Sequence, residues 1–283
     1  MNFDLEIVRR ALAEDVGAGD ATTLATVPPD AIASALMVAR EPLVVCGLPV
    51  AEAVFKEVSP KIEMEPQTED GRRTRRKESL LRLRGPAGAI LTAERVALNF
   101  MQHLSGVATL TARFVEAVAG TRARILDTRK TTPGLRQLEK YAVACGGGTN
   151  HRAGLYDRVL IKDNHLAALR GEAPNAIDAA ERRAREKYPA LQVEVEADTL
   201  EQVEQAVAAK ADVILLDNMS NEAMRTAVWL VNGRALVEAS GGVTLTTAGE
   251  IAATGVDFIS VGALTHSARA VDIALDFETG HER

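Results

Sequence analysis

Apolar positions in the first part of this chain recur with the spacing of amphipathic helices and short strands. Leu5, Val8 and Leu12 share one helical face ahead of Gly17, which predicts a short first helix. A longer apolar face with intervals of 7, 4, 3 and 4 residues follows Pro86 and predicts a long helix. We expect strands at 31–40, 62–65 and 80–84 and helices at 49–58 and 90–118.

From about residue 122 onward the pattern changes to short apolar segments that each end in polar residues or glycine. The ends of six such segments are 34, 34, 21, 23 and 22 residues apart, which suits a strand, a helix and two loops. The alternation predicts parallel strands joined by right-handed crossovers. We expect strands at 125–126, 159–161, 193–196, 213–216, 236–237 and 258–261, with connecting helices at 201–210 and 222–231.

The change of pattern predicts two domains joined near the long helix. We expect an α+β domain over 1–110, an α/β-barrel domain over 111–270 and a tail over 271–283 that can pack back onto the first domain. No glycine-rich dinucleotide turn and no Walker loop occurs in the chain. In α/β barrels and open α/β sheets, active sites lie at the carboxyl ends of the strands. The residues that follow the six apolar segments are therefore the candidates for chemistry.

Composition and charge narrow the class of protein. Hydrophobic residues make up 47% and charged residues 25% of the chain, as in ordinary globular proteins. A net charge of −6 argues against general binding of nucleic acid or anionic membranes. No apolar stretch approaches the ~20 residues that span a bilayer, and the acidic N-terminus lacks a signal pattern. Two cysteines cannot form a disulfide framework. We therefore expect a reduced, cytoplasmic protein.

Positive charge is concentrated around the first two barrel strands. Nine Lys or Arg and four Asp or Glu lie between Arg122 and His165. Four of the cations, Arg129, Lys130, Arg152 and Lys162, lie at or beside predicted strand ends. Grouped in one pocket, they require a polyanionic ligand, because unpaired cations in a partly buried site are costly. The alternative is a set of surface ion pairs.

Two carboxylates, Glu196 and Asp217, end the next two strands. Mg²⁺ typically takes one or two protein carboxylates together with phosphate oxygens and water. Beside a cationic pocket, these residues indicate a metal–diphosphate substrate. The alternative is that they only neutralise the lysines.

Glycine turns close the last two strands. Ser240-Gly241-Gly242 and Gly262-Ala263 allow backbone N–H groups to approach an anion, which indicates a phosphate site. The run 146–148 is a hinge or, given its position between two basic strand ends, a substrate-covering loop. His151 is a candidate hydrogen-bond donor to a carboxylate, with no second His or Cys at metal-ligand spacing.

Two further features have simpler explanations. Cys145 suggests a nucleophile, but no base partner is indicated, which favours a packed side chain. The basic run 72–77 is a solvated hairpin loop or, alternatively, an anion-binding patch.

Motifs along nearly the whole chain resemble the quinolinate phosphoribosyltransferases. The most specific ones lie between residues 127 and 165. The matching segments are Asp127-Thr128-Arg129-Lys130-Thr131, Pro133-Gly134-Leu135, Lys140-Tyr141-Ala142-Val143, Cys145-Gly146-Gly147-Gly148, His151-Arg152, Gly154-Leu155-Tyr156-Asp157, Ile161-Lys162-Asp163-Asn164-His165, Ala93-Glu94-Arg95, Leu104-Ser105-Gly106, Leu216-Asp217-Asn218 and Glu238-Ala239-Ser240-Gly241-Gly242.

The resemblance implies an N-terminal α+β sandwich followed by an open α/β barrel of six to seven parallel strands. It also implies a homodimer with shared active sites, with a hexamer of dimers as an alternative. The implied reaction joins quinolinate to 5-phosphoribosyl 1-diphosphate with Mg²⁺, giving nicotinate mononucleotide, CO₂ and diphosphate in NAD biosynthesis.

The resemblance also assigns roles to individual residues. Arg95 from the neighbouring subunit would bind the quinolinate carboxylates together with Arg129, His151, Arg152 and Lys162. Lys130 would contact the diphosphate side, and Glu196 and Asp217 the ribose and metal. The 5-phosphate would lie at the turns of Ser240, Gly241 and Gly242 and of Gly262 and Ala263, and Thr128 is counted with the substrate-binding residues.

Three other interpretations stay open at this point. A molybdenum-transport-associated relative shares the implied fold, although the intact basic motifs favour the quinolinate enzyme. A Schiff-base aldolase would use Lys162 or Lys130 as its amine. A phosphate-metabolite sensor would bind without turnover. The stretch 72–79 departs from the family pattern by being more basic.

Overall fold

The computed structural model describes residues 3–278, which divide into two compact units. The first unit comprises the chain up to Ala112, Thr132–Gly147 and the segment from Ser267 onward. The second comprises Arg113–Thr131 and Gly148–His266. The first unit carries an antiparallel sheet and the second a parallel one, which confirms the expected fold class. Residues 132–147 differ from the expected boundaries, since they lie in the first unit.

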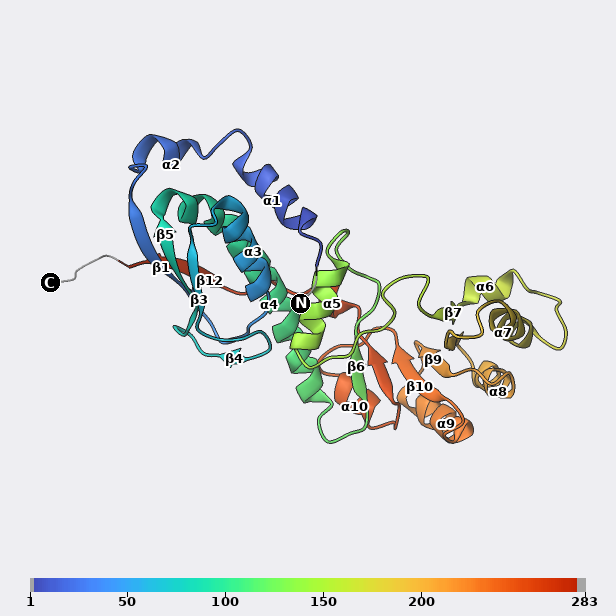
Figure 1. Cartoon of the computed structure of the whole chain (residues 1–283). Helices are drawn as coiled ribbons and strands as arrows, with labels where there is room; N and C mark the ends of the chain where they lie inside the picture. The colour runs from blue at the N-terminus through green and yellow to red at the C-terminus, as the bar shows by residue number, and fades with distance from the viewer. Residues whose placement is uncertain (1–2, 279–283) are drawn as a thin grey trace. The chain divides into compact units, whose positions relative to one another are not determined.

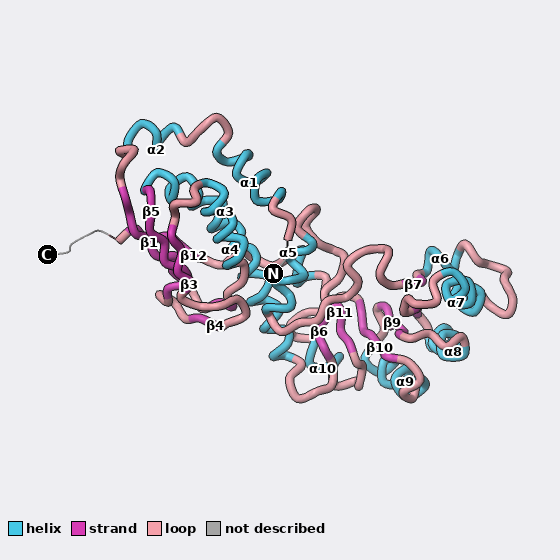
Figure 2. Tube along the Cα trace, in the orientation of Figure 1, coloured by secondary structure: helices cyan, strands magenta, loops and turns pink. Residues whose placement is uncertain are grey.

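A four-stranded antiparallel sheet organises the first unit, in the order β12-β1-β5-β3. Because β12 pairs with β1 along its whole length, the end of the described chain completes this sheet. Figure 2 shows these strands beside the helices of the same unit. The four strands of the sheet are β1 (Ile32–Ala39), β3 (Glu63–Pro66), β5 (Ser79–Pro86) and β12 (Ile273–Phe277). A separate pair is formed by β2 (Leu43–Val44) and β4 (Arg73–Thr74). The helices are α1 (Glu6–Val16), α2 (Ala21–Thr26), α3 (Leu48–Val58), α4 (Ala87–Ala117) and α5 (Arg136–Cys145).

Helix α4 provides much of the core of this unit. The apolar positions predicted for it, Ile90, Ala97, Met101, Leu104 and Ala108, are all fully buried. At ~25 cal/mol per Å² of buried apolar surface, each large side chain contributes about 1.5–3 kcal/mol to folding. The long helix is therefore held by its packing as well as by its backbone hydrogen bonds.

Helix α5 belongs to the first unit because its far end packs there. The Tyr141 hydroxyl donates a hydrogen bond to Asp70 Oδ2 at 2.9 Å. A Cβ atom on Gly146 would lie 2.4 Å from the Ala108 carbonyl oxygen and 2.6 Å from Thr111 Cβ. Gly146 is thus a close-packing glycine against α4, and the role of a covering loop predicted for 146–148 finds no support at this residue.

The two cysteines lie close together in the first unit as free thiols. Their sulfur atoms and an Asp70 carboxylate oxygen are all within 4.8 Å of one another. Cys46 is fully buried and Cys145 is half-buried. Burial raises the pKa of the Cys46 thiol far above its ordinary value. The Cys46 thiol beside it lowers the pKa of Cys145, which is packed in part and less fully than expected.

The basic run 72–77 forms part of a small strand pair instead of a simple loop. Strand β4 pairs with β2, and Thr74 is buried between exposed arginines. The arginine side chains face solvent, as the expectation of a solvated segment required.

Six parallel strands form the sheet of the second unit, in the order β6-β11-β10-β9-β8-β7. All six were predicted. Figure 1 shows α7, α8, α9 and α10 following one another along this sheet. The strands are β6 (Arg124–Leu126), β7 (Val159–Ile161), β8 (Val193–Ala197), β9 (Val213–Asp217), β10 (Leu236–Ser240) and β11 (Phe258–Ser260). The helices are α6 (Asp163–Ala167), α7 (Ala176–Lys187), α8 (Leu200–Ala208), α9 (Asn221–Val231), α10 (Ala248–Ala252) and α11 (Ala263–His266).

Hydrogen-bond register brings the strand ends of this sheet to one edge. Ser240 at the end of β10 pairs with Asp217 at the end of β9, and Ala197 on β8 pairs with Leu216. The polar residues that follow the apolar segments therefore gather there. Among the residues that the structure describes, no helix is both long enough and apolar enough to cross a membrane.

Candidate active site

A pocket of about 500 Å³ opens at the carboxyl ends of the parallel strands. Eleven of the residues singled out from the sequence line it, and all of them belong to the second unit. They are Thr128, Arg129, Lys130, His151, Arg152, Lys162, Glu196, Asp217, Ser240, Gly241 and Gly242. The structure confirms the predicted position of these residues, which lie together at the ends of the strands.

Lys162 and Glu196 form an ion pair at the pocket wall. Lys162 Nζ lies 3.0 Å from Glu196 Oε2, with exposed side-chain fractions of 46% and 11%. Lys162 immediately precedes α6, and its backbone N–H donates to His165 Nδ1 at 2.9 Å. The pairing is the neutralisation that the alternative interpretation of Glu196 predicted. Because the lysine is exposed, an anionic ligand can replace the carboxylate at little cost.

Arg152 contributes a second positive charge from a buried position. Its exposed fraction is 9%. Burial and the neighbouring Arg129 charge lower the pKa of Arg152, because two like charges close together repel each other. A bound carboxylate or phosphate relieves that repulsion. This electrostatic arrangement suits a ligand with more than one negative charge.

Asp217 is held at the pocket by its neighbour. Asn218 Nδ2 donates to Asp217 Oδ2 at 2.7 Å, and Asn218 has a φ of 53°. A Cβ atom on Gly241, where φ is 98°, would lie 2.1 Å from Asn218 Oδ1. The predicted glycine turn is therefore required by both backbone conformation and close approach. Gly241 and Gly242 leave their backbone available to a phosphate at this edge.

The turn after β11 does not line the pocket. Gly262 and Ala263 are outside the lining residues. A Cβ on Gly262 would lie 3.1 Å from Lys130 Cδ, and Thr265 Oγ1 donates to the Lys130 carbonyl oxygen at 2.7 Å. The turn thus packs against the Lys130 segment, and the contact of Gly262 and Ala263 with a 5-phosphate stays a prediction.

Arg95 lies on α4 in the first unit and is exposed. Within residues 3–278 its side chain makes no hydrogen bond or ion pair. An ion pair, which is the simplest structural role for an exposed arginine on a helix, is therefore absent for Arg95 in that part of the chain.

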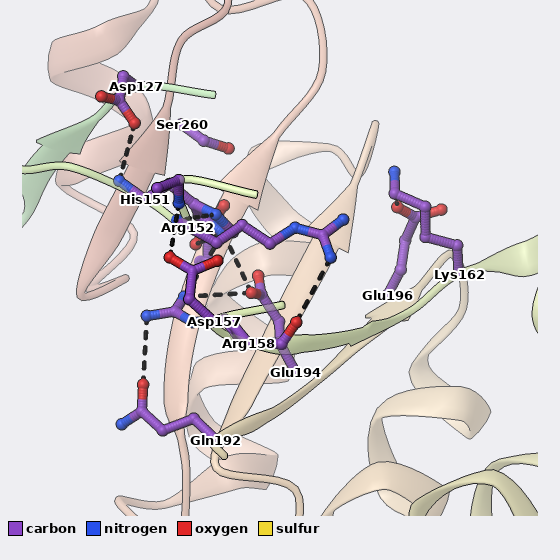
Figure 3. A network of polar contacts seen from close by, with 12 residues as sticks. Asp127, His151, Arg152, Asp157, Arg158, Lys162, Gln192, Glu194, Glu196 and Ser260 are labelled. Carbon is purple, nitrogen blue, oxygen red and sulfur yellow. Dashed lines mark hydrogen bonds and ion pairs between the residues drawn. The ribbon is translucent and has the colours of Figure 1, made fainter. Parts of the chain in front are cut away.

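A cluster that borders the pocket includes three residues, Arg158, Glu194 and Glu238, to which the sequence reasoning assigned no role. We call His151, Arg158, Glu194 and Glu238 the inner cluster. His151 Nε2 lies 3.0 Å from Glu194 Oε2 and 3.6 Å from Glu238 Oε2, and Arg158 Nη1 donates to Glu194 Oε2 at 3.2 Å. Both glutamates are fully buried. Figure 3 shows Glu194 among His151 and Arg158, apart from the Lys162–Glu196 pair.

The two buried carboxyl groups differ in charge. Burial raises the pKa of Glu194, but the hydrogen bond from His151 and the charge of Arg158 outweigh burial and leave it below its ordinary value. Burial and the nearby Glu194 raise the pKa of Glu238 well above its ordinary value. Neither Glu238 oxygen has a hydrogen-bond partner among the described residues. Glu194 is therefore the ionised member and Glu238 the protonated one.

His151 occupies a different setting from the one expected of a free hydrogen-bond donor. Its Nδ1 accepts the backbone N–H of Arg152 at 2.8 Å, while Nε2 faces Glu194. His151 lines the pocket, but both ring nitrogens already have partners. To form a direct hydrogen bond to a substrate, His151 would have to give up one of these two partners.

Two groups of side chains in this unit have the chemistry of metal ligands. Glu196 and Asp217 present hard oxygen atoms to the pocket, which fits Mg²⁺ bound together with phosphate oxygens. His151, Glu194 and Glu238 have ligand atoms within 4.8 Å of one another. In this buried group, Arg158 and His151 already contact Glu194 Oε2, while Glu194 Oε1 has no hydrogen-bond partner among the described residues. The donor set at the pocket therefore fits Mg²⁺ better.

Comparisons with known proteins match both units. Residues 20–105 match the sequence model of "Quinolinate phosphoribosyl transferase, N-terminal domain", and residues 107–276 match that of the C-terminal domain. The chain is 47% identical over 277 residues to a carboxylating nicotinate-nucleotide pyrophosphorylase of Mycobacterium leprae (strain TN), with 96% of each chain covered. Over an alignment of 294 positions, it is 42% identical to the chloroplastic carboxylating nicotinate-nucleotide pyrophosphorylase of Arabidopsis thaliana. That alignment covers 98% of this chain and 84% of the Arabidopsis protein.

A solved structure resembles the whole chain. The nicotinate-nucleotide pyrophosphorylase of Francisella tularensis superimposes with a TM-score of 0.92 at 38% sequence identity, covering 98% of each chain. The likeness in fold and in sequence therefore extends over both units.

Proposed function

The chain belongs to the quinolinate phosphoribosyltransferase family, and we propose that the pocket of its second unit is where the transfer occurs. The reaction joins the ring nitrogen of quinolinate to the ribose C1 of 5-phosphoribosyl 1-diphosphate. Diphosphate and CO₂ leave, and nicotinate mononucleotide remains, as in NAD biosynthesis. The observation that carries the proposal is the single pocket in which basic residues, two carboxylates and a glycine turn converge.

The basic residues bind and orient quinolinate. Arg129, Arg152 and Lys162 supply charge-assisted hydrogen bonds to its two carboxylates. Lys162 exchanges its Glu196 partner for the substrate, which frees that carboxylate for the ribose side. Holding the pyridine nitrogen near C1 converts an encounter of two molecules into a reaction within one complex.

The carboxylates act on the phosphoribosyl donor. Glu196 and Asp217 stabilise the positive charge that develops on the ribose as the bond to diphosphate breaks. They also would hold Mg²⁺, which when bound offsets the charge on the leaving diphosphate. Lys130 contacts the diphosphate side, and the backbone of Gly241 and Gly242 binds the 5-phosphate. After transfer, the 2-carboxylate leaves as CO₂, the electron pair of the broken C–C bond stays on the ring carbon beside the positively charged nitrogen, and that carbon then takes up a proton from solvent.

A Schiff-base aldolase is a poorer fit to the same pocket. Its amine needs an apolar setting that lowers the lysine pKa. Lys162 is 46% exposed and paired with a carboxylate, and Lys130 is exposed. Neither lysine has the apolar surroundings that such an amine needs.

A direct assay tests the function. Purified protein with Mg²⁺, quinolinate and the phosphoribosyl donor should release CO₂ and diphosphate in equal amounts, and omission of either substrate should abolish both. Release of diphosphate without CO₂ would contradict the decarboxylating transfer.

We further propose that the active unit is a homodimer in which Arg95 of the partner subunit reaches the pocket. The exposed position of Arg95 without a bonding partner among residues 3–278 supports this. A two-fold dimer has two identical composite sites. Mixing inactive Arg95→Ala and Lys162→Ala subunits should restore activity, because one site of a mixed dimer carries both substitutions and the other carries none. Verified subunit exchange without recovery would place Arg95 in its own chain's structure.

A further inference from the structure

Glu194 lies below the pocket floor and has no direct access to a ligand. It is the second residue of β8 with an exposed fraction of 0%, and it is absent from the pocket lining. Its Oε2 atom is shared between His151 at 3.0 Å and Arg158 at 3.2 Å. Any effect of Glu194 on a reaction in the pocket must therefore pass through a neighbouring side chain, and of its two partners at Oε2 only His151 lines the pocket.

The contacts of His151 fix which ring nitrogen carries the proton. Nδ1 accepts the backbone N–H of Arg152 at 2.8 Å, so that nitrogen needs its lone pair. The proton is consequently on Nε2, which faces the Glu194 carboxylate. A ring with the proton on Nδ1 would direct an N–H group at another N–H group and a lone pair at a carboxylate. Glu194, at 3.0 Å, favours the proton on Nε2, an atom that also lies 3.5 Å from Arg158 Nη1.

The same ring holds the segment that carries Arg152. Asp127, which is fully buried, accepts the backbone N–H of His151 at 2.8 Å, and His151 Nδ1 accepts that of Arg152. Two consecutive backbone groups are thus bound by buried acceptors. In Figure 3 the Arg152 side chain extends from the His151 ring toward the side where Lys162 and Glu196 lie.

We propose that Glu194 is a positioning residue for substrate recognition: it fixes the His151 ring with its proton on Nε2, and the ring then holds Arg152 in place for a substrate carboxylate. The identity of that substrate rests on the proposed function. The alternative is that Glu194 serves only to pair Arg158, which also donates to Gln192 Oε1 at 3.2 Å.

Two substitutions of Glu194 separate these roles. Glu194→Gln keeps an oxygen that can accept the Nε2 proton, whereas Glu194→Leu removes the acceptor. Misplacing a binding group by about 1 Å can cost roughly 100-fold. We expect Glu194→Leu to raise the KM for quinolinate by roughly 10- to 100-fold, with the KM for the phosphoribosyl donor within about twofold of wild type. Glu194→Gln should restore the quinolinate KM to within about threefold.

Glu181 offers a matched control. It is a buried glutamate in the same unit, and it accepts a hydrogen bond from Arg185 Nε at 2.6 Å on α7. Glu181→Leu and Glu181→Gln should leave both KM values unchanged. Equal losses for both substrates in Glu194→Leu, or an unchanged quinolinate KM, would overturn the positioning role.

An NMR measurement keeps the proposal testable even where Glu194→Leu does not fold. The chain has five histidines, so the imidazole ¹⁵N signals can be assigned by comparison with a His151→Gln variant. Wild type and Glu194→Gln should show His151 with its proton on Nε2. A proton on Nδ1 in wild type would overturn the inference. Absence of any turnover by wild type would instead overturn the proposed function, and the NMR result would still decide the link between Glu194 and His151.

Discussion

Glu194 and Glu196 are two residues apart on β8, and each lies 3.0 Å from a nitrogen atom of a basic side chain. Their environments are nevertheless opposite. Glu194 is fully buried beside a His151 side chain that is 7% exposed, whereas the Lys162 partner of Glu196 is 46% exposed. One strand thus carries a carboxylate at the pocket mouth and another beneath it (Figure 3).

The difference shows that equal distances do not imply equal roles. An exposed ion pair contributes about 0–1 kcal/mol, so a substrate can separate Lys162 from Glu196 at little cost. Removing one partner of a buried pair costs about 3–5 kcal/mol, because the remaining charge is left without compensation. We infer that the outer pair is exchanged during the reaction and that the inner one is permanent.

The largest expected effect is on stability. Glu194→Ala should lower the free energy of unfolding by about 3–5 kcal/mol, because Arg158 and His151 lose their buried partner. Glu196→Ala should change it by no more than about 1 kcal/mol. Urea unfolding followed by circular dichroism measures both variants. Similar losses in the two variants would mean that burial does not distinguish the pairs.

A smaller effect concerns pH and the protonated Glu238. Because its pKa is raised in the folded protein, the folded chain keeps a proton that the unfolded chain loses above its ordinary pKa of 4.5. Stability from this group is present below that value and is lost as the pH rises toward the folded pKa. Glu194, whose pKa is lowered, acts in the opposite direction and only as the pH falls below about 4.5.

The Glu238→Gln variant isolates the pH-dependent contribution of Glu238 to stability. Between pH 5 and 8, its free energy of unfolding should decline with pH less steeply than that of wild type, by up to about 1.4 kcal/mol per pH unit. Denaturant unfolding at several pH values measures the two slopes. Parallel slopes would show that Glu238 is ionised in the folded protein.

The residues at the pocket mouth could be predicted from the sequence, and the inner cluster could not. Lys162, Glu196 and Asp217 end buried apolar strands, and parallel strands bring their ends to one edge. The alternation Val193-Glu194-Val195-Glu196 places both glutamates on one face of β8 but says nothing about depth. The charge of the buried Glu194 is compensated by His151 and Arg158, which lie more than 30 residues earlier in the chain.

The unit boundaries show a similar limit. Local periodicity predicted β1, β3, β5 and the six parallel strands, yet β12 and α5 join the first unit through contacts that are distant in sequence. Tyr141 bonds to Asp70, and Gly146 packs against α4 where no Cβ atom fits. Neither contact leaves a periodic signal in the residues that make it.

The central claim is that the pocket mouth requires a substrate with two carboxylates. The kcat/KM values of the wild-type protein for quinolinate and for nicotinate, with the same phosphoribosyl donor, test this directly. Nicotinate lacks the 2-carboxylate and leaves cationic groups such as Arg152 and Lys162 without partners. A site built around such partners rejects the analogue by up to about 10⁴-fold. We predict a quinolinate preference of that order, and comparable values for the two substrates would contradict the account.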